Sequence, residues 1–334
     1  VSTSLIASDK LNTKSYYFFF KHSAYIALAI AILIIFSFLN QKILAKFSLI
    51  LFLMAFLSLL LVPFLGIEVK GSKRWLDLIF LPRFQPVEII KPFFIVTLSF
   101  MLTMQNRRLY FKYFLSTLFT LPILMLLVYQ PDIGQTLLIS MVWLALIFIS
   151  GINIFVFFIF FLFVGSTVSY LVLFVTKFEY IKIRLFAFLD SSSGNNYQAE
   201  KASDAIINGG FFGKGIGEGT LNSRVPEAHT DYIVSVISEE FGAIIVIGIL
   251  FLYLIFSYRV IRKINFANED LSKLILSGCV SLILIQTFIH VGVNIRILPT
   301  TGMTLPFLSY GGSSIVSTAI LSGLILNLTK RKLD

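Results

Sequence analysis

Long apolar runs separated by short polar segments make up most of this chain. A helix needs about 20 predominantly apolar residues to cross the hydrocarbon core of a bilayer, and most of these runs approach that length. The predicted fold class is therefore all-α, a polytopic transmembrane helix bundle. We expect nine spanning helices, near residues 23–39, 47–66, 86–104, 109–129, 133–150, 152–176, 232–257, 271–294 and 307–328.

The composition agrees with a membrane protein and excludes several other classes. Apolar residues make up 57% of the chain and charged residues 13%, whereas about 25% of residues are charged in soluble domains. The net charge of +10 comes largely from basic residues in short loops, and no basic stripe with interleaved aromatics indicates nucleic-acid binding. The single cysteine, Cys279, excludes an intrachain disulfide, and no Cys/His cluster typical of zinc sites is present.

The distribution of basic residues predicts how the chain is oriented. If the spans alternate, the basic short loops all lie on one side, which the positive-inside rule makes the cytoplasm. These loops and the C-terminus carry Lys42, Lys46, Arg107, Arg108, Lys112, Arg259, Arg262, Lys263, Lys330, Arg331 and Lys332. Segments 67–85, 177–231 and 295–306 are then extracytoplasmic.

The same orientation places residues 1–22 outside the cell. An outside N-terminus needs a segment that exports it, so the simplest account is a missing first spanning helix and ten spans in the intact protein. A true nine-span protein is the alternative. In either case we expect residues 1–334 to form a single membrane domain with one large extracytoplasmic loop, 177–231.

This loop is too long to be a simple turn, and loops of such length are usually functional or disordered. Residues 180–188 mix apolar and basic side chains as an interfacial segment would, and residues 197–207 can form a short helix. Six glycines follow between 209 and 219. The Gly213-Lys214-Gly215 run lacks the Ser or Thr of a nucleotide-binding loop. Two interpretations remain: a flexible loop, or a backbone that can approach an anionic head group closely.

Asp231 ends a polar run that begins at Pro226 and also contains Glu227 and His229. One interpretation is a helix N-cap, because Asp231 precedes an apolar helix. The other is a general base, because a carboxylate near apolar surface can have its basicity raised. Glu239 and Glu240 follow about two helical turns later.

A second polar constellation lies near the start of the 86–104 span. Glu88 and Lys91 are three residues apart, so they share a helix face and can pair, and ionisable groups inside a span are functional candidates. A structural ion pair is the alternative. The preceding outside segment carries four cations suited to binding phosphate, although they could equally contact solvent and anionic lipid: Lys70, Lys73, Arg74 and Arg83.

Two further polar positions complete the candidates. Asp132 opens the 133–150 span and is most simply an N-cap. A broken polar run extends from Asn294 through Arg296 to residues 309–314, which include Ser313. Non-helical backbone at a membrane edge is tolerated where protein covers it or where it lines a water-filled cavity. Alternatively, the small residues at 311–314 would allow close helix packing.

The order and spacing of these motifs resemble the SEDS family of bacterial cell-wall glycosyltransferases, FtsW and RodA, over nearly the whole chain. The matching motifs are residues 70–76, 84–88 with Lys91, 130–134, 197–198, 209–219, 226–231 with 239–242, and 305–314. Ala228 and residues 302–306 are similar to the division-type branch, FtsW. Val87 and Thr301 depart from the usual family pattern.

The resemblance implies a ten-span fold and polymerisation of lipid II into glycan strands. Asp231 would be the catalytic base, while Glu88 would orient Lys91. The residues expected to bind substrate are Lys73, Arg74, Glu88, Lys91, His229, Arg296 and Ser313. No cofactor is certain, and a divalent cation, Mg²⁺ or Mn²⁺, is an open candidate.

The resemblance also implies a class B penicillin-binding protein and other divisome proteins as partners, and a site in the bacterial inner membrane at the septum. Three alternatives remain open. They are a lipid II flippase without catalysis, a scaffold for a transpeptidase, and a rod-shape polymerase of the RodA type.

Overall fold

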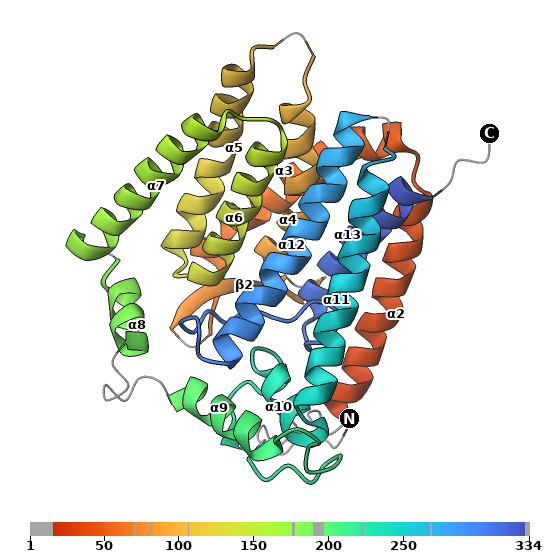
Figure 1. Cartoon of the computed structure of the whole chain (residues 1–334). Coiled ribbons are helices and arrows are strands. Elements are labelled where there is room, and N and C mark those ends of the chain that lie inside the picture. Colours follow the sequence, from red (N-terminus) through yellow and green to blue (C-terminus); the bar gives the residue numbers. More distant parts are fainter. Residues whose placement is uncertain are drawn as a thin grey trace. The chain divides into compact units, whose positions relative to one another are not determined.

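The computed structural model describes residues 16–69, 71–78, 81–105, 107–175, 178–189, 197–221, 224–267 and 269–330. The helices are α2 Tyr17–Phe38, α3 Gln41–Leu65, α4 Pro86–Leu102, α5 Leu109–Tyr129, α6 Ile133–Ile149, α7 Ile154–Phe174, α8 Glu179–Leu189, α9 Tyr197–Gly209, α10 Ile233–Phe241, α11 Ala243–Ile264, α12 Asp270–Asn294 and α13 Gly312–Thr329 (Figure 1). Lys70, Arg331 and Lys332 lie outside the described residues.

A helix occurs within each range expected to span the membrane. In the described part of the chain, six segments are long and apolar enough to cross a bilayer: α2, residues Phe47–Leu65 of α3, α5, α11, α12 and α13. Helices α4 and α6 are shorter, at 17 residues each. The predicted polytopic helix bundle is confirmed.

The expected span 232–257 is wrong, because the chain breaks at Gly242 into α10 and α11. Gly242 has φ 84°, and a Cβ there would lie 2.2 Å from the carbonyl oxygen of Phe211. Only glycine accommodates this backbone and this approach. The last helix also begins later than expected, at Gly312 rather than near residue 307.

The segment expected as a plain outside loop contains strands. Strands β1 Ile67–Val69, β2 Ser72–Leu78 and β3 Leu81–Phe84 form an antiparallel sheet in the order β1-β2-β3. Glu68 pairs with Lys73, and Leu76 pairs with Phe84. The all-α bundle therefore carries a small sheet that fixes the backbone of the basic segment.

The chain divides into two compact units, each described here by itself. Unit 1 contains Val1–Ala24, Phe158–Phe256 and Gln286–Gly311. Unit 2 contains Tyr25–Phe157, Ser257–Ile285 and Gly312–Asp334. That residues 1–334 form a single domain stays a prediction.

Helix α4 is the centre of unit 2. It packs against α3, α5, α6, α13 and β2, and most of its side chains are buried. Small residues let neighbouring helices approach closely, as is typical in membranes. A Cβ at Gly278 of α12 would lie 2.6 Å from the side chain of Ile95, and one at Gly323 of α13 would lie 2.7 Å from Phe36.

In unit 1, α9 packs against α10, and the expected helix at 197–207 is confirmed with a slightly later end. A Cβ at Gly209 would lie 2.0 Å from the carbonyl oxygen of Ser238, so the two helices meet backbone to backbone. This contact holds the polar loop against the short helix that follows Asp231.

Candidate active site

The turn that carries Asp231 is built around one backbone carbonyl of unit 1. Glu227 has φ 51°, a left-handed conformation that is uncommon outside glycine. Its carbonyl oxygen accepts the N–H groups of Thr230 at 3.1 Å, Asp231 at 3.1 Å and Tyr232 at 3.3 Å. The Thr230 hydroxyl donates to the Glu227 carboxylate at 3.1 Å. The turn is therefore a closed unit that presents Asp231 in a defined backbone conformation.

Residues 305–310, which lie outside the turn itself, hold it by hydrogen bonds. The Ser309 hydroxyl donates to the carbonyl oxygen of Thr230 at 2.6 Å and accepts the N–H of Leu305 at 2.8 Å. The N–H of Tyr310 donates to the carbonyl oxygen of His229 at 2.9 Å. The broken polar run before α13 thus clamps the Asp231 turn.

Asn294, the last residue of α12, fixes Asp231 itself. Its side-chain amide is fully buried and donates to the carbonyl oxygen of Asp231 at 3.1 Å and to that of His290 at 2.8 Å. Its side-chain oxygen accepts the N–H of Ser235 at 3.3 Å. Sequence reasoning placed Asn294 only in a polar run, so this bridging role was missed.

The N-cap interpretation of Asp231 is wrong. Tyr232 occupies the N-cap position of α10, and no side-chain cap hydrogen bond forms there. Burial, together with the negative charge of Asp231, raises the pKa of Tyr232, so its phenol stays protonated.

His229 and Arg296 also belong to unit 1. The His229 ring lies 5.6 Å from the Tyr310 ring and 6.0 Å from the Phe18 ring. Arg296 is partly exposed and has φ 60°, directly after α12 ends. His290 is buried in α12, and its Nδ1 lies 2.7 Å from the Met303 carbonyl oxygen.

The glycine run has a structural role in its first half. The N–H groups of Lys214 and Gly215 donate to the carbonyl oxygens of Glu239 and Glu240, which end α10. The Glu239 carboxylate accepts the Asn208 amide at 2.9 Å and the N–H of Leu221 at 2.8 Å. Residues 209–215 are therefore held against α10 by backbone contacts, and whether the glycine run approaches an anionic head group stays a prediction.

In unit 2, the cation Arg74 of β2 is engaged with the start of α6. Its guanidinium donates to the carbonyl oxygens of Gln130 and Pro131 and lies 3.6 Å from the Asp132 carboxylate. Asp132 occupies the expected N-cap position of α6, and its carboxylate accepts the Gln85 side-chain amide at 3.1 Å. Burial raises the pKa of Asp132, and Arg74 opposes this shift.

Glu88 and Lys91 form the predicted pair, with Lys91 Nζ 2.7 Å from Glu88 Oε2 and both side chains buried. The Gln135 amide donates to Glu88 Oε1 at 2.7 Å. Together with Arg74 and Asp132, these groups give two positive and two negative charges. The buried network is therefore electrically balanced.

The two other candidates of unit 2 differ in exposure. Lys73 is exposed on β2, beside the partly buried Arg74. Ser313 is buried, and its hydroxyl accepts the N–H of Gln85, the N-cap residue of α4, at 3.0 Å. Ser313 therefore ties the first turn of α13 to the start of α4.

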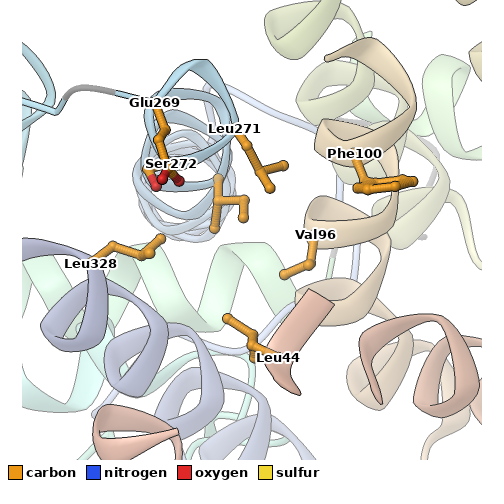
Figure 2. A pocket seen from close by; sticks show the side chains of 8 residues that line it. Leu44, Val96, Phe100, Glu269, Leu271, Ser272 and Leu328 are labelled. Carbon is orange, nitrogen blue, oxygen red and sulfur yellow. The ribbon is translucent and has the colours of Figure 1, made fainter. Parts of the chain in front are cut away.

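A pocket in unit 2 is lined by residues other than those of the ionic network. It is lined by Leu44, Val96, Phe100, Glu269, Leu271, Ser272, Ile275 and Leu328 (Figure 2). These residues come from the start of α3, the end of α4, the start of α12 and the end of α13. Its walls are mostly apolar, so it offers little for a phosphate or a sugar.

Within the described residues, no cluster of three or more His, Cys, Asp or Glu side chains could hold a metal ion. The side chains present therefore do not fit an all-protein metal site. The candidate residues fall into two sets: Asp231, His229 and Arg296 in unit 1, and Lys73, Arg74, Glu88, Lys91 and Ser313 in unit 2.

The fold and the clamped polar turn define a multi-pass membrane protein with an extended polar segment between spans. The family described as a cell cycle protein, FtsW/RodA/SpoVE, matches residues 1–333. The chain belongs to this family, which confirms the SEDS resemblance.

Relatives and solved structures agree with this family assignment. The chain is 33% identical over 339 residues to a probable peptidoglycan glycosyltransferase FtsW of Coxiella burnetii, covering 98% of this chain and 90% of the relative. It is 30% identical to the probable FtsW of Caulobacter vibrioides, covering 99% and 84%.

Among structures, a chain from a peptidoglycan synthase complex has a TM-score of 0.79 at 26% identity, covering 98% of this chain and 95% of that one. The rod shape determining protein RodA of Thermus thermophilus has a TM-score of 0.67 at 26% identity, covering 98% and 93%.

Proposed function

We propose that this chain is a peptidoglycan glycosyltransferase that polymerises lipid II during cell division, with Asp231 as its catalytic base. Relatives that share about a third of its residues across nearly its full length carry that activity in their names. The observation that supports the role of Asp231 is the clamp around its turn. Asn294 donates to the carbonyl oxygen of Asp231, and Ser309 donates to that of Thr230. The N-cap position of α10 is occupied by Tyr232.

In the proposed reaction, the 4-hydroxyl oxygen of one sugar attacks the anomeric carbon of another. The new C–O bond forms as the bond from that carbon to the diphosphate oxygen breaks. The electron pair leaves with undecaprenyl diphosphate, and the hydroxyl proton passes to the Asp231 carboxylate. A base held in place makes this transfer faster by about 10²–10⁴-fold.

Cations would stabilise the negative charge that develops on the leaving diphosphate. Arg296 suits this role best, because it belongs to the unit that carries Asp231, is partly exposed and forms no ion pair in the described part of the chain. Lys73 of unit 2 stays a predicted phosphate-binding cation. The charges of Arg74 and Lys91 are compensated by Asp132 and Glu88. We therefore assign Arg74 and Lys91 to holding the starts of α4 and α6 in place. No step of this mechanism uses a metal ion.

The remaining proposals concern place and partners. The chain would work in the bacterial inner membrane at the septum, with its C-terminus in the cytoplasm and polyprenyl tails against its Phe-rich spans. A class B penicillin-binding protein and other divisome proteins would be its partners. The similarity to a chain whose structure is described as coordinating polymerization and crosslinking in a peptidoglycan synthase complex supports such a partnership.

A reconstitution separates the enzyme from a flippase or a scaffold. The purified chain in lipid vesicles, supplied with lipid II and the partner transpeptidase blocked by a β-lactam, is expected to produce long uncrosslinked glycan strands. A flippase would move lipid II between leaflets without producing polymer, and a scaffold would do neither. Either of those outcomes contradicts the proposal.

A further inference from the structure

Four large apolar side chains stand exposed at the end of α9 and along the glycine-rich segment that follows it in unit 1. Ile207, Phe211, Phe212 and Ile216 are 75%, 71%, 85% and 74% exposed. Large apolar side chains grouped this way at a surface mark an interaction site more often than ordinary surface. The proposed reaction uses none of them.

The backbone beneath these side chains is fixed. The N–H groups of Ala243 and Ile244 donate to the carbonyl oxygens of Gly210 and Phe211 at 3.0 and 3.3 Å. A Cβ at Gly213 would lie 2.3 Å from the carbonyl oxygen of Glu240. Because the backbone is bound on both sides of Phe212, the phenylalanines cannot turn inward without breaking these contacts. Their exposure is a built-in feature of the loop.

The same hydrogen bonds place the loop at the membrane surface. Ala243 and Ile244 are the first residues of α11, which is long and apolar enough to cross a bilayer. Residues bound to the first N–H groups of a spanning helix lie where that helix enters the hydrocarbon region. The first turns of α11 are themselves apolar and exposed, with Ile244 at 48% and Ile247 at 61%, as lipid-facing positions are.

We propose that segment 207–216, the end of α9 and the loop after it, inserts into the extracytoplasmic leaflet, with Phe211 and Phe212 among the acyl chains. The exposed Lys214, two residues after Phe212, would lie near lipid phosphates. The insertion continues the lipid-facing surface of α11 onto the loop. The insertion fixes how deeply the C-terminal end of α10 lies in the membrane. Asp231 precedes the N-terminal end of the same helix.

Fluorescence of the full-length chain in lipid nanodiscs tests this directly. Cys279 is fully buried, so a thiol-reactive NBD dye labels a cysteine introduced by Phe212→Cys. The matched control is Asp204→Cys, a half-exposed position on the polar part of α9. We expect NBD at position 212 to show blue-shifted emission and to lose emission when doxyl-labelled phosphatidylcholine is included. NBD at position 204 should keep water-like emission and resist the quencher.

Two results would overturn the proposal. One is water-like, unquenched emission from position 212 in nanodiscs. The other is emission that shifts only after a partner transpeptidase is added and stays insensitive to doxyl lipid, which would make the loop a protein-docking surface.

Discussion

At the scale of single residues, the resemblance indicated Asp231, but no sequence pattern connects Asp231 with Asn294. The two residues are 63 positions apart, and only the folded chain brings the Asn294 amide to the Asp231 carbonyl oxygen. The competing N-cap interpretation could not be excluded from sequence either, because Asp231 and Tyr232 are adjacent and the helix start decides between them. The resemblance identified the residue, and tertiary contacts assign its environment.

Asn294→Ala should lower both stability and activity. The change leaves two carbonyl oxygens and one N–H without this partner, and an unsatisfied buried polar group costs about 1–3 kcal/mol. We expect a lower thermal unfolding temperature and slower polymerisation, with lipid II binding little changed. Measuring the three quantities on one preparation checks this. Full polymerisation activity would show that Asn294 does not position the catalytic turn.

The glycine at the α9–α10 contact gives a second residue-level prediction. Gly209→Ala places a Cβ 2.0 Å from the carbonyl oxygen of Ser238, so the helices must separate. We expect a clear loss of thermal stability. Gly248→Ala in α11 is the matched control, since nothing lies within 4 Å of its Cβ and alanine is favoured over glycine in a helix by about 1 kcal/mol. Equal unfolding temperatures for the two variants would refute the close contact.

At the scale of elements, hydrophobic patterning located the helices well, because spans must be continuously apolar. It failed where polar contacts or backbone geometry determine the secondary structure. The break at Gly242 was missed since an apolar run follows it and the residues before it, including Glu239 and Glu240, are compatible with a continuous helix. Strands β1–β3 were missed since they are short and lie in a polar segment. The Glu88–Lys91 pair was predicted because helical spacing alone brings the two side chains together.

The buried pair on α4 can be separated into structural and functional parts. Glu88→Gln leaves Lys91 as an uncompensated buried charge, a change that typically costs about 3–5 kcal/mol. The double variant Glu88→Met with Lys91→Met leaves no unpaired charge. It should therefore unfold at a higher temperature than either single variant. The exposed pair of Lys273 and Asp270 is the control, where Lys273→Ala should cost about 0–1 kcal/mol.

The same double variant decides the role of Lys91. If Lys91 only holds α4 and α6 in place, the folded double variant keeps measurable polymerisation. A stable double variant without any activity would instead make Lys91 a group that binds the diphosphate.

At the scale of the whole molecule, the polytopic bundle and the family could be predicted from the apolar pattern and the ordered motifs, and both are confirmed. The division into two units could not be predicted, because each unit is assembled from three segments distant in the chain. Residues of unit 1 carry the proposed base, and residues of unit 2 carry the balanced ionic network. Function therefore depends on chain segments that no local pattern connects.

The most direct measurement is glycan polymerisation by Asp231→Asn beside Asp204→Asn, both as full-length chains in vesicles with lipid II. Asp204 is a half-exposed carboxylate of α9, so its change controls for loss of one negative charge. The account predicts that Asp231→Asn folds and binds lipid II but polymerises at least about 100-fold more slowly, while Asp204→Asn matches the unaltered chain. Glycan strands made by Asp231→Asn at the unaltered rate would contradict the assignment of Asp231 as the base.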